Sequence, residues 1–333
     1  MAASSQSRSG KKFWLLGTGI VLVIALYTAG WFYAASTLKN TVLSTIGPGN
    51  SGGVSGECSD IDFRGYPFRI GLFCSKVDVD DNNNGVSATF GALRSAAQVY
   101  APGHIVWELD SPAEIRTARG LSVNAEWANM QSSLVTKFKG VDRSSTVIDG
   151  LKATAVSSAT GQTITFDAGR TELHLRQNGP DLDGAVSLID AQTVIKDWPQ
   201  VLPKLSASAD LTLAGKAGMI DGRDAKGLYG ASGELRKAVA DIGGGKVMTL
   251  SGPFSFDEEG YLSAQFKLQI EDVNAWRDSI KQSFPDIAKT VETAAKLLKA
   301  MAGGGGTVSV DLVVQRGNAT VSGFIPLGQI PPI

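Results

Sequence analysis

The chain is poor in the residues that most often carry chemistry. Its 333 residues include two histidines and two cysteines. The histidines, His104 and His174, lie far apart and fall on the polar side of alternating segments, where a solvated or locally bonded imidazole is expected. No Ser/His/Asp or Cys/His set can be assembled, and scattered carboxylates form no defined pair. We predict no catalytic residues, no metal site and no cofactor, and a protein that is not an enzyme.

Clusters of basic residues are also missing. The formal net charge is −1, and the three basic residues at the N-terminus contribute +3, so the rest of the chain carries −4. A nucleic-acid-binding surface gathers Lys and Arg on one face. No such cluster is present, which excludes nucleic acid as a predicted partner.

The sequence has only one long apolar run. It covers Phe13 to Ala35, with 23 uncharged residues. As a helix it would be roughly 35 Å long, enough to cross a hydrocarbon core of ~30 Å. Trp14 stands at one end, and Trp31 and Tyr33 at the other, as in the aromatic belts of membrane spans. The run predicts one N-terminal transmembrane anchor at residues 13–35.

The flanks of the run predict its orientation. Arg8, Lys11 and Lys12 precede it without any acidic residue, so residues 1–12 are expected to form a cytoplasmic tail and the bulk to lie across the membrane. The alternative is a cleaved signal peptide, for which residues 34–36 would supply small residues. The run is longer than the apolar region of such peptides, and both alternatives export the bulk.

The two cysteines lie beyond the anchor, 16 positions apart. Exported cysteines tend to pair, so a disulfide between Cys58 and Cys74 is predicted, which would stabilise the fold by ~3 kcal/mol in the chain-entropy model. Two buried free thiols or a metal pair remain as alternatives. A metal pair would need two further ligands that the neighbouring sequence does not provide.

Beyond the anchor the dominant period is two. In the clearest segment, residues 262–270, Leu, Ala, Phe, Leu and Ile alternate with Ser, Gln, Lys and Gln. This alternation is typical of half-buried antiparallel strands. We expect a helix extension and flexible tether over residues 36–56 and a periplasmic β-rich domain over 57–333, with two halves, about 57–200 and 201–333, as an alternative.

Helical periodicity appears mainly late in the chain. One helix is expected after Asp272, with Trp276 and Ile280 on its apolar stripe, and a second follows up to the glycines at 303–306. A weaker helical pattern covers residues 191–202. The predicted fold class is mainly β (β-rich α+β), with curved antiparallel sheets packed on a late helical pair. Such a sheet would form an apolar trough if the helices filled it incompletely.

Two short motifs resemble ligand-binding loops without completing them. Asp80 to Gly85 matches the first half of a calcium loop, but Gly91 stands where the bidentate Glu belongs. Gly243 to Lys246 resembles a phosphate loop, but Val247 replaces the Ser or Thr and the first glycine is missing. Both are interpreted as turns.

Several segments resemble a known family. They are RGYPFRIGLFC at 64–74, AQVYAPGHIVWEL at 97–109, ELHLR at 172–176 and GFIPLGQIPP at 323–332. Together they resemble the alphaproteobacterial family called domain of unknown function 2125. The resemblance implies an inner-membrane anchor, a periplasmic β-rich body and no assigned activity. At fold level the layout is similar to AsmA-like envelope proteins that handle lipid, an analogy only.

The segment at 64–74 has two interpretations. The favoured one is a first core strand, with Phe68, Ile70 and Leu72 on one face, joined to Cys58. The other is an aromatic and basic rim that meets lipid headgroups. The sequence predicts a membrane-anchored protein whose function is to bind lipid or another apolar ligand, or to dock an envelope partner. The alternatives are a structural scaffold module with a packed core and an unrecognised hydrolase.

Overall fold

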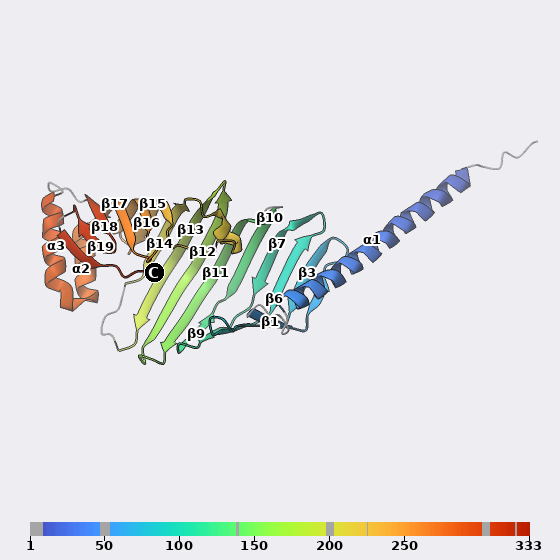
Figure 1. Cartoon of the computed structure of the whole chain (residues 1–333), viewed down its shortest axis with the longest axis horizontal. Helices are drawn as coiled ribbons and strands as arrows, with labels where there is room; N and C mark the ends of the chain where they lie inside the picture. Colours follow the sequence, from blue (N-terminus) through green and yellow to red (C-terminus); the bar gives the residue numbers. More distant parts are fainter. Residues whose placement is uncertain are drawn as a thin grey trace, which may run out of the picture.

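The structure, a computed structural model, describes residues 9–46, 54–137, 140–197, 203–224, 226–301, 307–323 and 325–333. Most of the predicted tether, residues 47–53, and the first eight residues of the predicted tail lie outside these ranges. The fold class is confirmed: one antiparallel sheet with two late helices follows an N-terminal apolar helix (Figure 1).

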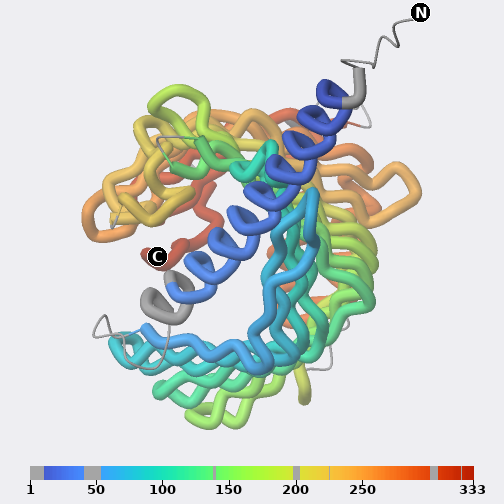
Figure 2. The backbone as a smooth tube through the Cα atoms, turned by 90° about the vertical axis from the view of Figure 1, so that its right-hand side faces the viewer, coloured from blue at the N-terminus to red at the C-terminus, as the bar shows by residue number. Residues whose placement is uncertain are grey.

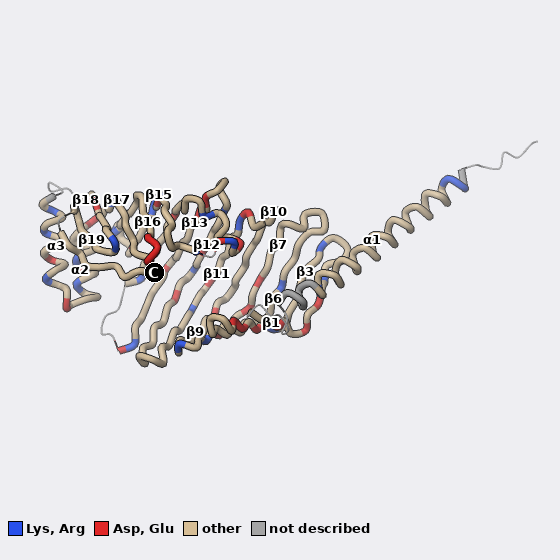
Figure 3. The backbone as a smooth tube through the Cα atoms, in the orientation of Figure 1, with Lys and Arg blue, Asp and Glu red and all other residues tan. Residues whose placement is uncertain are grey.

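The N-terminal helix α1 covers Ser9–Ile46; its first part projects away from the molecule, and its last part lies beside the first strands (Figure 1). Its stretch Lys11–Asn40 is long and apolar enough to cross a membrane, and no other helix of the described residues is. Figure 3 shows basic residues at the start of α1 and an uncharged stretch after them. The helix can therefore anchor the protein in a membrane.

Within the described residues, twenty strands form one sheet. The first ten are β1 Val54–Ser59, β2 Asp62–Arg64, β3 Arg69–Cys74, β4 Lys76–Asp81, β5 Val86–Phe90, β6 Leu93–Gln98, β7 Ala101–Leu109, β8 Ala113–Thr117, β9 Leu121–Glu126 and β10 Asn129–Lys137. The last ten are β11 Gly140–Ser157, β12 Thr163–Asn178, β13 Asp181–Ile195, β14 Leu205–Leu213, β15 Ser232–Asp241, β16 Val247–Phe256, β17 Leu262–Glu271, β18 Thr307–Gln315, β19 Asn318–Val321 and β20 Ile325–Gln329.

The sheet forks at β11. Residues 140–149 of β11 pair with β10, whereas residues 152–157 pair with β9. One wall therefore runs through β10, β7, β6, β3 and β2, and the other through β9, β8, β5, β4 and β1. At the fork the ladders between β11, β12 and β13 are interrupted but keep their register, and Gly150 and Asp190 have positive φ there. The pairing of β13 with β14 shifts register between Leu188 and Ala191. Seen along its length, the sheet curves into a C (Figure 2).

Alternation and register together place a row of apolar side chains on one face of the sheet from β12 to β15. Leu173 of β12 lies beside Val186 of β13, which lies beside Ala209 of β14, which lies beside Ala238 of β15. We call this the apolar face. The other face of the same strands, the charged face, carries residues such as His174 and Asp210, because successive side chains of a strand point to opposite sides.

The late helices α2 (Val273–Ser283) and α3 (Ala288–Met301) cover the apolar face at the C-terminal end. Ile270 and Val308, opposite each other in β17 and β18, are 6% and 1% exposed and pack with Val273 and Ala295 of the helices. The carboxylate of Asp272 accepts a hydrogen bond from the Ala275 N–H, which caps α2. The predicted helix pair is present, joined by a short 3₁₀ turn, Pro285–Ile287.

The weak helical prediction for residues 191–202 is wrong over its described part. Residues 191–195 are the end of β13, where Ile195 pairs with Ile164 of β12. Pairing along a neighbouring strand overrides a weak local preference, since most helix stability in proteins comes from packing. Residues 198–202 lie outside the described ranges. The sheet continues across this region, because Leu188 of β13 pairs with Ala207 of β14.

Candidate ligand-binding surface

The candidate site is the part of the apolar face that no helix of the described residues covers, on β11–β14. Its centre is the pair Leu173 and Val186, whose side chains are 45% and 39% exposed. Half-buried apolar side chains on the same face surround them: Ile148, Leu175, Leu188, Ala207, Ala209 and Leu211. At ~4.8 Å between strands, the four strands span roughly 15 Å. This surface can bury an extended apolar group.

The uncovered surface has boundaries on the same face. At one end of β13 and β14, Leu182 and Leu213 are buried beside the 3₁₀ segment η1, Ala217–Asp221, which contacts β11–β13. Toward the C-terminus, the face is closed by α2 and α3. The exposed apolar surface is therefore a defined patch between covered regions of one sheet.

The charged face behind this patch is a network of ion pairs. The carboxylate of Asp183 accepts hydrogen bonds from Arg176 (2.7 Å), Thr212 (2.8 Å) and Arg236 (3.1 Å). The Arg176 guanidinium is the main cause that holds the pKa of Asp183 well below its usual range. Arg236 also pairs with Asp210. Because Asp183 is held ionised by its arginine partners, it is not prepared to give or take a proton near neutral pH.

A second hollow lies on the charged face of the first wall. Its volume is about 590 Å³, and its lining includes Phe73, Val106 and Val147, with Arg94 and Glu108 among the polar residues. Arg94 donates two hydrogen bonds to Asp110, at 2.7 and 2.6 Å, and holds the pKa of that carboxyl below its usual range. Val106 alternates with Ile105 and Trp107 along β7, so periodicity alone does not indicate this hollow.

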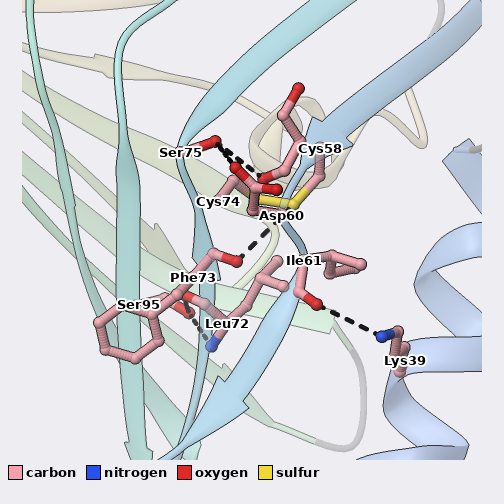
Figure 4. The surroundings of a disulfide bond; sticks show 10 residues. Lys39, Cys58, Asp60, Ile61, Leu72, Phe73, Cys74, Ser75 and Ser95 are labelled. Atoms are coloured by element: carbon pink, nitrogen blue, oxygen red, sulfur yellow. Dashed lines mark hydrogen bonds between the residues drawn. A yellow bond between two sulfur atoms is a disulfide. The ribbon is translucent and has the colours of Figure 1, made fainter.

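The disulfide joins the two walls. Cys58 of β1 and Cys74 of β3 are bonded, and the Cα atoms are 5.2 Å apart (Figure 4). Beside the bond, the hydroxyl of Ser75 donates to the carboxylate of Asp60 at 2.7 Å. Lys39 of α1 donates to the carbonyl of Ile61 at 3.3 Å. Covalent and polar contacts therefore tie the wall ends to each other and to the base of α1.

The other sequence-predicted residues do not converge on a site. The calcium-like segment is the hairpin turn between β4 and β5, where the Asp81 carboxylate accepts from Asn83 and Asn84. The phosphate-loop-like glycines form the turn between β15 and β16. His104 and His174 are exposed on different strands, and His174 is 3.3 Å from Glu172. In the described part of the chain, no three His, Cys, Asp or Glu residues are grouped as a metal site would require.

Comparison with known proteins finds a match to one protein family. A family model described as "Uncharacterized protein conserved in bacteria (DUF2125)" matches residues 31–331, which is most of the chain. No curated protein and no solved structure matches. The match covers both walls, the uncovered surface and the late helices.

Proposed function

The chain belongs to this bacterial DUF2125 family, and we propose that it is an inner-membrane-anchored, non-enzymatic protein whose folded part lies in the periplasm and holds lipid on the apolar face. The observation that carries the proposal is the exposed pair Leu173 and Val186 at the centre of a continuous apolar surface. Exposed apolar patches on soluble domains mark interaction sites, because leaving them in water costs about 25 cal/mol per Å².

The anchor supports a lipid as the occupant. A helix with an uncharged stretch of membrane length keeps the sheet beside a bilayer. The basic residues Lys11 and Lys12 at its start favour a cytoplasmic N-terminus, which puts the sheet on the periplasmic side. Acyl chains match the aliphatic side chains of β12–β14 on this face, beside which Thr146 and Thr171 are the neighbouring polar residues. They are available within the reach of the anchor.

The charged face supports the absence of catalysis. Asp183, Asp210 and Asp110 are each paired with an arginine, and no cysteine is free because Cys58 and Cys74 are bonded to each other. A catalytic acid or base needs a pKa near the working pH. Arginine partners instead lower the pKa of Asp183 and of Asp110.

A second candidate function is the docking of an envelope protein. The hollow lined by Phe73, Val106 and Val147 favours it, because apolar side chains rimmed by charged residues are typical of protein contact sites. This hollow lies on the charged face, so the two functions use different sides of the sheet and can be separated by mutation.

The experiment is native mass spectrometry of the full-length protein gently extracted from membranes. We expect phospholipid-sized additions on the wild-type mass. Leu173→Glu should reduce the lipid-bound fraction at least fivefold, because a carboxylate at the centre of the surface must be desolvated by an acyl chain. Ser208→Glu, on the charged face of β14, is the matched control and should leave the fraction unchanged. A wild-type protein without lipid, or equal loss in both variants, would contradict the proposal.

A further inference from the structure

Two turns form an exposed aromatic rim at the N-terminal end of the sheet. They are residues 65–68, between β2 and β3, and residues 99–100, between β6 and β7. The N–H of Val99 donates to the carbonyl of Phe68 at 3.0 Å, which holds the turns together. Phe68 and Tyr100 are 71% and 77% exposed, and Tyr66 and Val99 are exposed as well. We call these four residues the aromatic rim.

The rim is fixed against α1. Tyr27 of α1 donates to the carbonyl of Pro67 at 2.5 Å, and the hydroxyls of Thr28 and Tyr66 are 2.7 Å apart. The indole N–H of Trp31 donates to the carbonyl of Arg69 at 2.9 Å. The ring of Tyr66 also packs edge-on against Trp31, with centroids 5.6 Å apart. These contacts place the rim beside residues 27–31 of the helix.

The position along α1 sets the depth of the rim. If the hydrocarbon core begins at Phe13, its ~30 Å take about 20 helical residues and end near Phe32. The contacts at residues 27–31 therefore lie in the last roughly 8 Å of the hydrocarbon core, on the side of the folded part. Tyrosine and tryptophan side chains concentrate at the adjoining membrane–water interface in membrane proteins.

We propose that the aromatic rim is a membrane-docking site that inserts Phe68 and Tyr100 into the leaflet on the side of the folded part. Burial of these rings recovers apolar surface that would otherwise face water. Arg69 adds a headgroup contact, since it is exposed and takes part in none of the ion pairs among the described residues. The occupant is the bilayer in which α1 is embedded.

The docking site gives the proposed lipid surface an orientation. Both walls begin at the rim end, where α1, β1 and β3 lie together (Figures 1 and 2). Docking holds this end at the bilayer and directs the sheet away from it, with the late helices at the far end (Figure 1). This consequence rests on the proposed function, whereas the docking itself rests only on the anchor and its contacts.

The test is photo-crosslinking of the full chain in phospholipid vesicles. Benzoylphenylalanine replaces Phe68 in one protein and Tyr100 in another, and lipid adducts are counted by mass spectrometry. Phe32 of α1 is the position for the positive control, and Leu327 in β20, exposed at the far end, is the negative one. We expect adducts at positions 68 and 100 at no less than a third of the Phe32 level and at least tenfold above Leu327.

Adducts at Phe32 without adducts at either rim position would overturn the docking site. Both rim side chains are exposed, so the substitutions are not expected to disturb folding. The same reagent at Leu173 reports on the lipid surface. Lipid adducts at position 173 without adducts at 68 and 100 would refute the docking site alone. Lipid adducts at 68 and 100 without adducts at 173 would refute the lipid surface alone.

Discussion

The same apolar alternation has different outcomes at the C-terminal end and in the middle of the sheet, as two pairs of facing residues show. Ile270 lies opposite Val308, and Leu173 lies opposite Val186, each pair on the apolar face. The first pair is almost fully buried by α2 and α3, whereas the second is about two-fifths exposed. Alternation therefore predicts which face is apolar, but not whether anything covers that face.

Under the proposed function, this difference assigns stability to the covered end of the sheet and lipid binding to its middle. At the covered end, burial of apolar side chains stabilises the fold. In the middle, the same kind of side chain contributes little to stability and remains available to a ligand. The predictions below test this division by changing matched positions, beginning with the largest expected effect on the free energy of unfolding.

Val308→Asp should disrupt the covered end. Val308 is 1% exposed, and burying a carboxylate there without a partner is expected to lower the free energy of unfolding by more than about 4 kcal/mol. Ser309→Asp, on the exposed side of the same strand, is the control and should cost less than about 1 kcal/mol. Urea denaturation measures both. A small effect at 308 would show that the late helices do not seal this end.

Removal of the disulfide should weaken the opposite end of the sheet. The pair Cys58→Ser and Cys74→Ser opens a loop of 16 residues, and we expect a loss of about 3 kcal/mol. The walls meet β11 at their other side, so the middle of the sheet should keep its structure. Hydrogen exchange measures this: protection should fall in β1 and β3 and persist in β12 and β13. Uniform loss would contradict the two-wall arrangement.

Asp183→Asn should lower the free energy of unfolding, because the ion pairs of the charged face help to stabilise the uncovered region. Arg176 and two further donors lower the pKa of Asp183, so its stabilisation is present above the ordinary carboxyl pKa near 4 and is lost as pH falls below it. We expect a loss of about 2 kcal/mol at pH 7 that shrinks toward pH 3. Asp197→Asn, at an exposed position after β13, is the control. If the difference in the free energy of unfolding between the wild type and Asp183→Asn does not depend on pH, the charge network is refuted.

Leu173→Ala should have the smallest effect on stability, below about 1 kcal/mol, because its side chain is already 45% exposed. A buried leucine would cost about 2–5 kcal/mol. Thermal unfolding of the delipidated protein measures the difference. A loss of 3 kcal/mol or more would mean that the surface is covered in solution, which would favour the packed scaffold.

The sequence was sufficient for the elements whose signals are local. The uncharged run at 13–35 predicts the anchor, the alternation at 262–270 predicts β17, and the apolar stripe after Asp272 predicts α2. The disulfide followed from the two cysteines and the expected compartment. These signals span a few residues and need no partner.

The features of the site depend on partners far away in sequence. The fork needs β11 to pair with both β9 and β10, and no pattern within residues 140–157 indicates this. The sequence offers a rim at residues 64–74 only as the second interpretation, and the contacts of Tyr66 with Thr28 and Trp31 join residues across the tether. The exposure of Leu173 depends on where the late helices pack, which periodicity does not specify.

The most direct test of the central claim places benzoylphenylalanine at Leu173 in one full-length protein and at His174 in another. These neighbours lie on opposite faces of β12, and both are exposed. Irradiation of each protein in phospholipid vesicles, followed by mass spectrometry, should give lipid adducts at 173 at least tenfold above those at 174. Equal yields at the two positions, or no adducts at 173 while position 32 of α1 is labelled, would contradict the account.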